Sequence, residues 1–428
     1  MARRYVMSLF SVALLILLTL MLGASVGANT KTVTLMHFWG LGVERQHITD
    51  TIRAFEEANP DIKVEEVIID SAAYQAKIIQ TLPSDAAPDV FAWWAGIRTQ
   101  RLVDFEMLSP LTSLWQEGKL DDIFSPVFKE NATYQDDQWF IPWGVHGVVF
   151  FYSKAAFSKL GLTVPTTYQE FEALIEKAQA AGYEHPIATG HKALYRQEFP
   201  AEWLALGIGG VDLYKGLASF DISWGSSEGR KVLELWKKQI DDGWYFPDPR
   251  SRSWQEGLRL LVQDKCILYM QGSYAAAVLK NDLGWEPGED FDVFMPPMVD
   301  PANPPALTGP TDVWVMSRNA SHSEEARRLL KFLAGVDAQT IRARVAGGMA
   351  GNRLVPDSVY DPVVAKVKAS LDKGAAFAPN YDMLTPQIGF QRVLREAMAE
   401  FFEKPDVDRF IYAAEQAKQE WIASGRAK

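Results

Sequence analysis

Near its start the chain alternates three short apolar strands with two amphipathic helices, and this order restricts the folds that it can adopt. The strand-like runs cover 32–39, 62–69 and 88–94, and helix-like runs at 44–59 and 73–82 separate them. A β-α-β-α-β order predicts a parallel sheet covered by helices, and therefore an α/β fold. In open sheets of this kind, ligands bind beyond the carboxyl ends of the strands. Side chains at those ends are therefore the first candidates for a binding site.

Tryptophan occurs at these strand ends. The chain has 14 Trp, and Trp39, Trp93 and Trp94 stand at the ends of the first and third strand-like runs. Neighbouring residues of a strand point to opposite faces of the sheet. We therefore expect one of Trp93 and Trp94 to enter the core and the other to face a ligand.

The first residues have the pattern of an export signal. Two arginines precede an apolar run from Val6 to Leu22, and small residues follow at 26–28. The pattern predicts a signal peptide at 1–28 that is cleaved after Ala28. A permanent membrane anchor is the alternative, although the run is near the lower length limit for a membrane span. No cysteine follows the run, so we expect a freely soluble periplasmic protein rather than a lipid-anchored one.

Composition excludes several classes of function. The formal net charge is −11, and removing 1–28, which contains two arginines and no acidic residue, makes it −13. Such an acidic chain is a poor partner for nucleic acid or anionic lipid. Cys266 is the only cysteine, so no intramolecular disulfide can form. The six histidines lack zinc-site spacing, and no phosphate loop, dinucleotide fingerprint or serine elbow is present, so we predict neither a metal nor a cofactor.

A second informative stretch runs from Tyr134 to Lys154. It predicts a strand, a turn at Asp136-Asp137, a strand ending at Pro142, and an apolar strand from Val145 to Tyr152. Further along, Thr167-x-x-Glu170 and Ser321-x-x-Glu324 have the pattern of capping boxes, which predicts a helix start at each.

Together with features elsewhere, this stretch resembles the extracytoplasmic sugar-binding proteins of ABC transporters, the maltodextrin-binding family among them. The features, in order, are the strand end at Trp39, the strand at Pro88-Asp89-Val90, the Asp-Asp hairpin before Pro142, the block Phe151-Tyr-Ser-Lys154 with Phe157 and Gly161, the run from Lys265 to Tyr274, and Thr308-Gly309 before the strand at Val313. Each is weak alone, but their common order spans nearly the whole mature chain. The chain departs from the family at Asp264-Lys-Cys-Ile-Leu, where Gly-Lys-Ala-Ala-Met is common, and at Tyr274, where Trp is frequent.

The resemblance implies a two-lobe α/β fold of the periplasmic-binding-protein type, with discontinuous lobes joined by a multi-strand hinge. The chain would cross between lobes at Pro142-Trp143 and return at Asp312-Val313. One lobe would combine 29–143 with 313–349, and the other would combine 144–312 with 350–428.

The same resemblance implies a binding protein rather than an enzyme. It would capture a mono- or oligosaccharide between the lobes and deliver it to the membrane permease of an ABC importer, and we expect it to act as a monomer. Two alternatives remain open from the residues. An exported glycan-active enzyme would need a pair of carboxylates across the scissile bond. A two-lobe protein for another solute would bind a polyamine or an iron complex, and iron would need Tyr, His and carboxylate ligands together.

By position in the resemblance, the candidate ligand contacts fall into two chemical kinds. Flat aromatic faces stack on the C–H patches of a sugar, and polar groups satisfy its hydroxyls. The expected aromatic contacts are Trp39, Trp93, Trp94, Tyr195 and Tyr274. The expected polar contacts are Arg98, His146 and Asp312, with Glu44 and Asp382 as secondary candidates. Trp143 could equally pack in the hinge, and Trp224 and Trp254 are interpreted as residues that staple helix starts.

Overall fold

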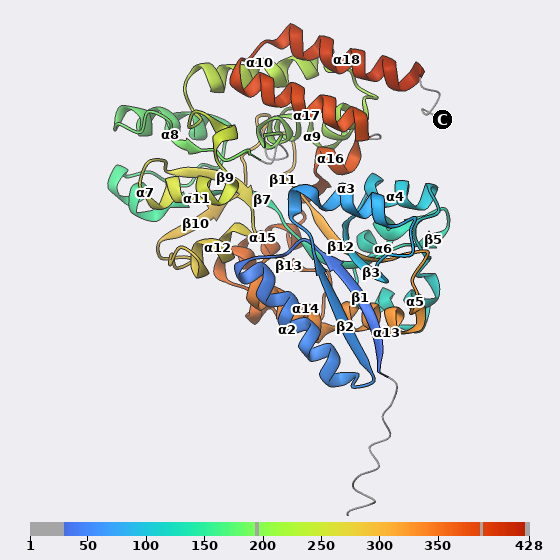
Figure 1. The fold of residues 1–428 in the computed structure, drawn as a ribbon. Coiled ribbons are helices and arrows are strands. Elements are labelled where there is room, and N and C mark those ends of the chain that lie inside the picture. Colours follow the sequence, from blue (N-terminus) through green and yellow to red (C-terminus); the bar gives the residue numbers. More distant parts are fainter. Residues whose placement is uncertain (1–29, 193–196, 386–387, 424–428) are drawn as a thin grey trace, which may run out of the picture.

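The structure, a computed structural model, describes residues 30–192, 197–385 and 388–423 (Figure 1). The predicted signal peptide and Tyr195 lie outside these residues. Within the described ranges, no helix has both the length and the apolar character needed to cross a membrane.

The first lobe is built on a six-stranded sheet, and the predicted alternation of strands and helices forms its centre. In spatial order the strands are β13 (Met349–Ala350), β6 (Ile141–Val145), β12 (Thr311–Met316), β3 (Val90–Trp94), β1 (Lys31–His37) and β2 (Ile62–Ile68). Strands β1, β2 and β3 are parallel, whereas β12 runs antiparallel to both β3 and β6. The α/β fold class is therefore confirmed.

Helices cover this sheet, and a separate two-stranded hairpin accompanies it. The helices of the first lobe are α2 (Gly42–Ala58), α3 (Ser71–Thr81), α4 (Ile97–Asp104), α5 (Thr112–Glu117), α6 (Pro126–Ala132), α13 (Ser323–Ala334) and α14 (Val336–Ala346), and β4 (Thr133–Tyr134) pairs with β5 (Asp137–Gln138). Helix α2 shows why the lobe holds together. Its Ile48 and Phe55 are buried on one face and belong to the core beneath the sheet, as the spacing of an amphipathic helix requires.

The second lobe is built on a four-stranded sheet. Its spatial order is β10 (Phe291–Phe294), β7 (Val148–Ser153), β9 (Leu268–Gly272) and β8 (Ile187–Ala188). Strand β7 is antiparallel to both of its neighbours, whereas β8 and β9 are parallel. A separate parallel pair joins β11 (Ala306–Gly309) to β14 (Ala376–Pro379).

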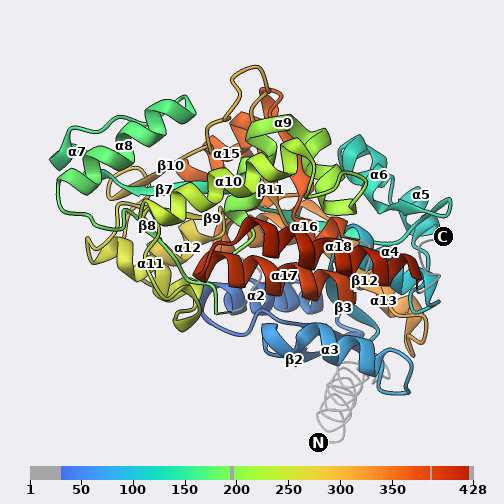
Figure 2. The same cartoon turned by 90° about the horizontal axis from the view of Figure 1, so that it is seen from above.

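The other α-helices of the described residues contribute to the cores around this second sheet. They are α7 (Lys154–Leu160), α8 (Tyr168–Ala180), α9 (Phe199–Ser219), α10 (Ser227–Asp241), α11 (Trp254–Val262), α12 (Ala275–Asn281), α15 (Pro362–Asp372), α16 (Tyr381–Leu384), α17 (Ile388–Glu403) and α18 (Val407–Ala423). Helices α17 and α18 lie side by side and pack against α10, as Figures 1 and 2 show. The C-terminal helices therefore pack against a helix from the middle of the sequence, α10.

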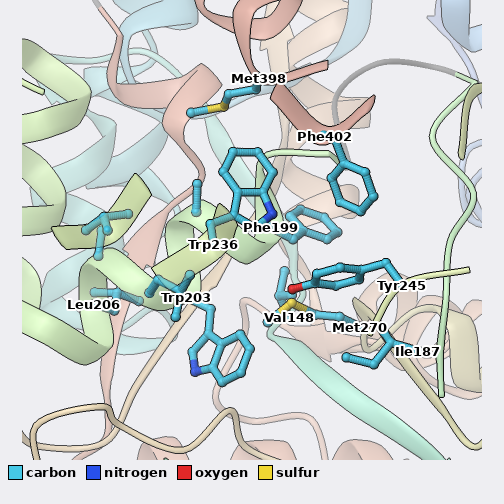
Figure 3. Close-up of a cluster of buried hydrophobic side chains, with 14 of the residues drawn as sticks. Val148, Ile187, Phe199, Trp203, Leu206, Trp236, Tyr245, Met270, Met398 and Phe402 are labelled. Atoms are coloured by element: carbon cyan, nitrogen blue, oxygen red, sulfur yellow. The ribbon is translucent and has the colours of Figure 1, made fainter. Parts of the chain in front are cut away.

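The two lobes have separate cores. The first-lobe core takes its buried residues from Val33 to Trp143 and again from Val313 to Ala338. The largest core of the second lobe draws on β7, α8, α9, α10 and the C-terminal helices, and Figure 3 shows its aromatic centre, with Trp236 and Phe402 among the labelled side chains. A smaller cluster packs on the other side of β7 and β9. Each lobe thus buries apolar surface of its own.

Two local expectations fail. The tight turn lies one residue earlier than predicted, because Gln135 and Asp136 have the positive φ values. The turn is followed by β5, and the strand expected to end at Pro142 is β6, which continues through Pro142 to Val145. Proline lacks the N–H that a sheet ladder requires, but Pro142 pairs with Val313 at a register shift in β12, where a bulge interrupts the ladder.

One of the two predicted capping boxes is present. At α8, Thr167 accepts a hydrogen bond from the Glu170 N–H, and the Glu170 carboxylate binds back to the Thr167 N–H. The predicted capping box at Ser321 is wrong. Helix α13 begins after His322, which is its N-cap residue, and the His322 side chain makes no capping hydrogen bond. Asp89 accepts a hydrogen bond from the His322 N–H at 3.0 Å instead. A carboxylate distant in the sequence thus takes the place of a local cap.

Candidate functional site

Three segments of the described chain lie together where the two main sheets meet, at 145–148, 310–311 and 349–350, and we refer to them as the crossing segments. The chain leaves β6 at Val145 and enters β7 only three residues later, at Val148. Val145 pairs with Thr311 on one side and with Met349 on the other. The His146 N–H also donates to the Pro310 carbonyl at 3.2 Å. Residues from distant parts of the chain therefore meet at one place between the lobes, around Val145, His146, Thr311 and Met349, which we call the seam.

The lobes also touch on both sides of this seam. Helix α2 contacts α12, and α4 contacts α16. At the first contact, a Cβ added to Gly42 would come within 3.3 Å of the Asp282 carboxylate, and at the second, one added to Gly96 would come within 2.6 Å of the Met383 carbonyl. At both places the backbone of a first-lobe glycine therefore lies close to the second lobe, against a side chain at Asp282 and against the backbone at Met383.

A buried polar cluster lies at the seam. Arg342 of α14 donates from Nη2 to His146 Nε2 at 2.8 Å and to Asp312 Oδ2 at 3.2 Å. Arg342 is 2% exposed, and His146 and Asp312 are each 5% exposed. Burial lowers the pKa of His146, and Asp312 opposes that effect. Burial likewise lowers the pKa of Arg342 against the opposing charge of Asp312. The cluster brings together two predicted residues, His146 and Asp312, and one that the sequence did not signal.

Tyr274 stands beside this cluster and is partly exposed. It follows β9 and opens α12. Its ring meets His146 edge-on at 5.1 Å and Trp254 edge-on at 5.3 Å. Its hydroxyl donates to Gln271 Oε1 at 2.6 Å. Polar and aromatic neighbours therefore hold the Tyr274 side chain in place.

Trp94 and Arg98 reach the same region from the first lobe. Asp312 is the cross-strand partner of Trp94, and directly paired residues place their side chains on the same face of a sheet. The Arg98 guanidinium lies 4.7 Å from the Trp94 ring centre, in the range of a cation–π contact. The Trp94 ring also stacks on Phe38 at 5.0 Å. Trp94 thus links the polar cluster to α4.

Two predicted aromatic contacts lie in the first-lobe core instead. Trp93 is 1% exposed, and Trp94 next to it is partly exposed, as the alternation of a strand predicts. Trp39 is 5% exposed and packs edge-on against Trp314 and His47. Neither Trp39 nor Trp93 therefore presents an open ring face in this structure.

The secondary candidates differ in what the structure describes. Glu44 is partly buried in the first turn of α2, and its charge acts to raise the pKa of Arg342. The side chain of Asp382, like the whole of Tyr195, lies outside what the structure describes. Among the described residues, no group of three His, Cys, Asp or Glu side chains could hold a metal ion.

Sequence reasoning missed Arg342 and Trp254. Arg342 lies on a helix of weak amphipathic pattern, and no local motif marks it. Trp254 is interpreted from the sequence as a residue that staples a helix start, and in the structure it opens α11 directly after Ser253, which forms a capping box with Glu256. The only signal for Trp254 in the sequence was a tryptophan at a predicted helix start, and its contact with Tyr274 is seen only in the structure.

Two surface hollows lie away from this region. One is lined by Gln179, His185 and Asp242 among others, and the other by residues of β10 and α15 such as Val293 and Lys366. Neither is lined by a Trp or Tyr side chain. They therefore lack the paired aromatic and buried polar groups found at the seam.

Comparisons with known proteins agree with this architecture. The chain is 25% identical over 380 residues to an uncharacterised ABC transporter extracellular-binding protein of Pyrococcus horikoshii, and the match covers 85% of this chain and 84% of the relative. Among solved structures, it resembles AcbH, a bacterial solute receptor with an exclusive preference for β-D-galactopyranose, with a TM-score of 0.84 and 19% identity over 92% of this chain and 99% of that one. It also resembles maltose-bound MalE3 of T. maritima, with a TM-score of 0.74 and 18% identity over 90% of this chain and 99% of that one.

These likenesses establish the two-lobe fold. The model of a protein family, the bacterial extracellular solute-binding proteins, matches residues 44–340, which is more than half of the chain. This chain therefore belongs to the bacterial extracellular solute-binding protein family.

Proposed function

We propose that this protein captures a sugar between its lobes and delivers it to the permease of an ABC importer. The observation that carries the proposal is the convergence of Tyr274 and Trp94, from opposite lobes, on one buried polar cluster. The solved relatives described above include receptors for galactopyranose and maltose, and their likeness in fold supports the same class of solute here.

The chemistry of the site fits a sugar. A pyranose presents C–H patches to aromatic rings and hydroxyls to donors and acceptors. Tyr274 and Trp94 would supply the ring faces, and Arg98, His146 and Asp312 would supply polar groups. Trp39 and Trp93 are left out of this proposed set because both are buried in the first-lobe core. Trp254 is added because its ring meets Tyr274 edge-on.

We also propose that the lobes are discontinuous, with 29–143 and 313–349 in the first and 144–312 and 350–428 in the second. The composition of the first core, from Val33 to Trp143 and from Val313 to Ala338, supports this division. The three crossing segments would then form the hinge. Closure about them would enclose the sugar, because a solute that touches both lobes favours the closed state.

The remaining parts of the proposal concern location and partners. Export with cleavage after Ala28 would release a soluble monomer that meets its permease at the membrane. We propose no catalytic role for any residue, and we expect the sugar to leave the site unchanged.

A thermal-shift screen of the mature protein against sugars, polyamines and metal ions would test the proposal. We expect a sugar to raise the melting temperature, because a ligand of the native state alone stabilises it by mass action. Calorimetry should then give one site, and chromatography should recover the same sugar after incubation. Stabilisation by a polyamine or a metal ion alone, or the appearance of a cleaved product, would contradict the proposal.

A further inference from the structure

The contact between Arg342 and His146 determines where the proton of His146 lies. A guanidinium has only N–H donors and no acceptor, so a ring nitrogen that it contacts must accept. Arg342 Nη2 lies 2.8 Å from His146 Nε2. Nε2 therefore carries no proton, and the neutral ring must carry its proton on Nδ1.

The alternative tautomer conflicts with this geometry. His146 Nε2 is 3.3 Å from Asp312 Oδ2, a separation that would suit an N–H donor on Nε2. That N–H would face a donor of Arg342 at 2.8 Å, so two donors would compete for the same space. The two hydrogens of Arg342 Nη2 resolve the conflict, because one can reach His146 and the other can reach Asp312 at 3.2 Å.

The Nδ1 side of His146 is left without an acceptor. Nδ1 is buried and has no hydrogen-bond partner among the described residues. Gly348, with a φ of +84°, lies beside it, and a Cβ at this position would come within 2.7 Å of Nδ1. Glycine therefore keeps a side chain away from this nitrogen. Leaving a buried donor without an acceptor is destabilising, so an acceptor supplied by a solute would relieve that penalty.

The surroundings of His146 come from several elements. Arg342 reaches it from α14, Asp312 from β12, and Tyr274 from the start of α12. His47 of α2 is close enough that a positive charge on His146 would lower the pKa of His47. Of these groups, only Arg342 makes a contact that requires an unprotonated Nε2.

We propose that Arg342 is a positioning residue that holds His146 as a neutral Nδ1–H donor to an oxygen acceptor of the bound sugar. This inference rests on the proposed function and refines it. The solute must present a hydroxyl or ring oxygen to His146, while Asp312 is already engaged by Arg342. Arg342 thereby sets which hydrogen-bonding pattern the site accepts without needing to touch the sugar.

Nitrogen-15 NMR of the histidine rings in the sugar-free mature protein tests the first part of the proposal, the tautomer of His146. A His146→Gln variant assigns the signals. We expect the His146 signals of an Nδ1–H ring in the wild type. Arg342→Met should shift His146 toward the Nε2–H form, because Nε2 can then donate to Asp312. Arg342→Lys, which retains a cationic donor, should restore the Nδ1–H form at least in part. Arg344→Met, at an exposed position on the same helix, should leave the signals unchanged.

Calorimetry with the sugar found in the thermal-shift screen tests the second half. Arg342→Met should weaken affinity about tenfold or more, as expected for losing a net hydrogen bond of about 1.5 kcal/mol, and Arg342→Lys should recover part of it. Circular dichroism and melting curves verify that each variant folds. An Nε2–H or charged His146 in the wild type would overturn the assignment, whatever the sugar result. Unchanged affinity in Arg342→Met would overturn the role in recognition. If no sugar binds the wild type, the proposed function fails and the recognition role with it, while the NMR result still decides the tautomer.

Discussion

At the scale of single residues, Tyr274 combines a partly exposed ring with fixed neighbours. Its hydroxyl is held by Gln271, and its ring lies between His146 and Trp254. Such a ring can stack on a solute without first losing rotamer freedom.

Replacing Tyr274 by alanine should weaken sugar binding by about 2–3 kcal/mol, or roughly a hundredfold. The substitution removes a flat apolar face from the site. Tyr274→Phe retains that face and loses the hydrogen bond to Gln271, so it should weaken sugar binding by only about 1 kcal/mol. Calorimetric titration of both variants, beside their melting curves, measures the difference. A Tyr274→Ala protein that melts early but binds normally would show that Tyr274 has only a structural role.

At the scale of elements, the crossing strand β6 depends on a glycine. A Cβ at Gly144 would collide with the guanidinium of Arg342, which lies flat against this part of the backbone. The strand and helix α14 can therefore approach closely only because Gly144 has no side chain. This close approach is what allows Arg342 to reach His146 and Asp312.

We expect Gly144→Ala to lower the free energy of unfolding by about 1–3 kcal/mol, as overpacking of a dense interior does. The cause can be isolated with a double-mutant cycle. In an Arg342→Ala background the colliding group is gone, so the same Gly144→Ala change should cost much less. Equal costs in both backgrounds, measured by thermal or denaturant unfolding, would rule out the collision as the cause.

At the scale of the whole molecule, the seam between the lobes suits a hinge motion. Few crossing segments connect two lobes with separate cores, so the lobes can rotate with little internal change. The mature protein should therefore become more compact when sugar binds. Small-angle scattering with and without saturating sugar should give a smaller radius of gyration in its presence. An unchanged radius, despite binding seen by calorimetry, would argue against closure.

Three buried histidines of the first lobe and the seam make stability depend on pH. Burial lowers the pKa of His37, His47 and His146. In the unfolded chain the same groups titrate near 6.5, so below that pH the unfolded state takes up protons that the native state resists. The stability contributed by neutral histidine is therefore present above about pH 6.5 and is lost as the pH falls toward the native pKa values.

We expect the melting temperature to fall as the pH is lowered from about 7 to 5, a range above the ordinary pKa values of carboxylates. His47→Gln should reduce this dependence, because the most strongly shifted of the three groups is removed. A melting temperature that is flat over this range would contradict the burial of neutral histidine.

Local and periodic features of this protein could be read from its sequence alone. The alternating strands and helices of 32–94 and the cap at Thr167 depend on residues within a few positions of one another. The same is true of the helix start at Tyr274, just after Gly272. Their patterns carry enough information to predict the fold class. The resemblance to sugar-binding proteins used the same kind of local signal, repeated in order along the chain.

Other features were decided only by tertiary structure. The contact between Arg342 and His146 joins residues 196 positions apart, and Asp89 reaches the start of α13 across 233 positions. Strand alternation predicted that Trp93 and Trp94 differ, but only the packing of the sheet showed that Trp93 is the buried one. Such contacts depend on how the two lobes bring distant segments together at the seam, and no local pattern in the sequence records that geometry.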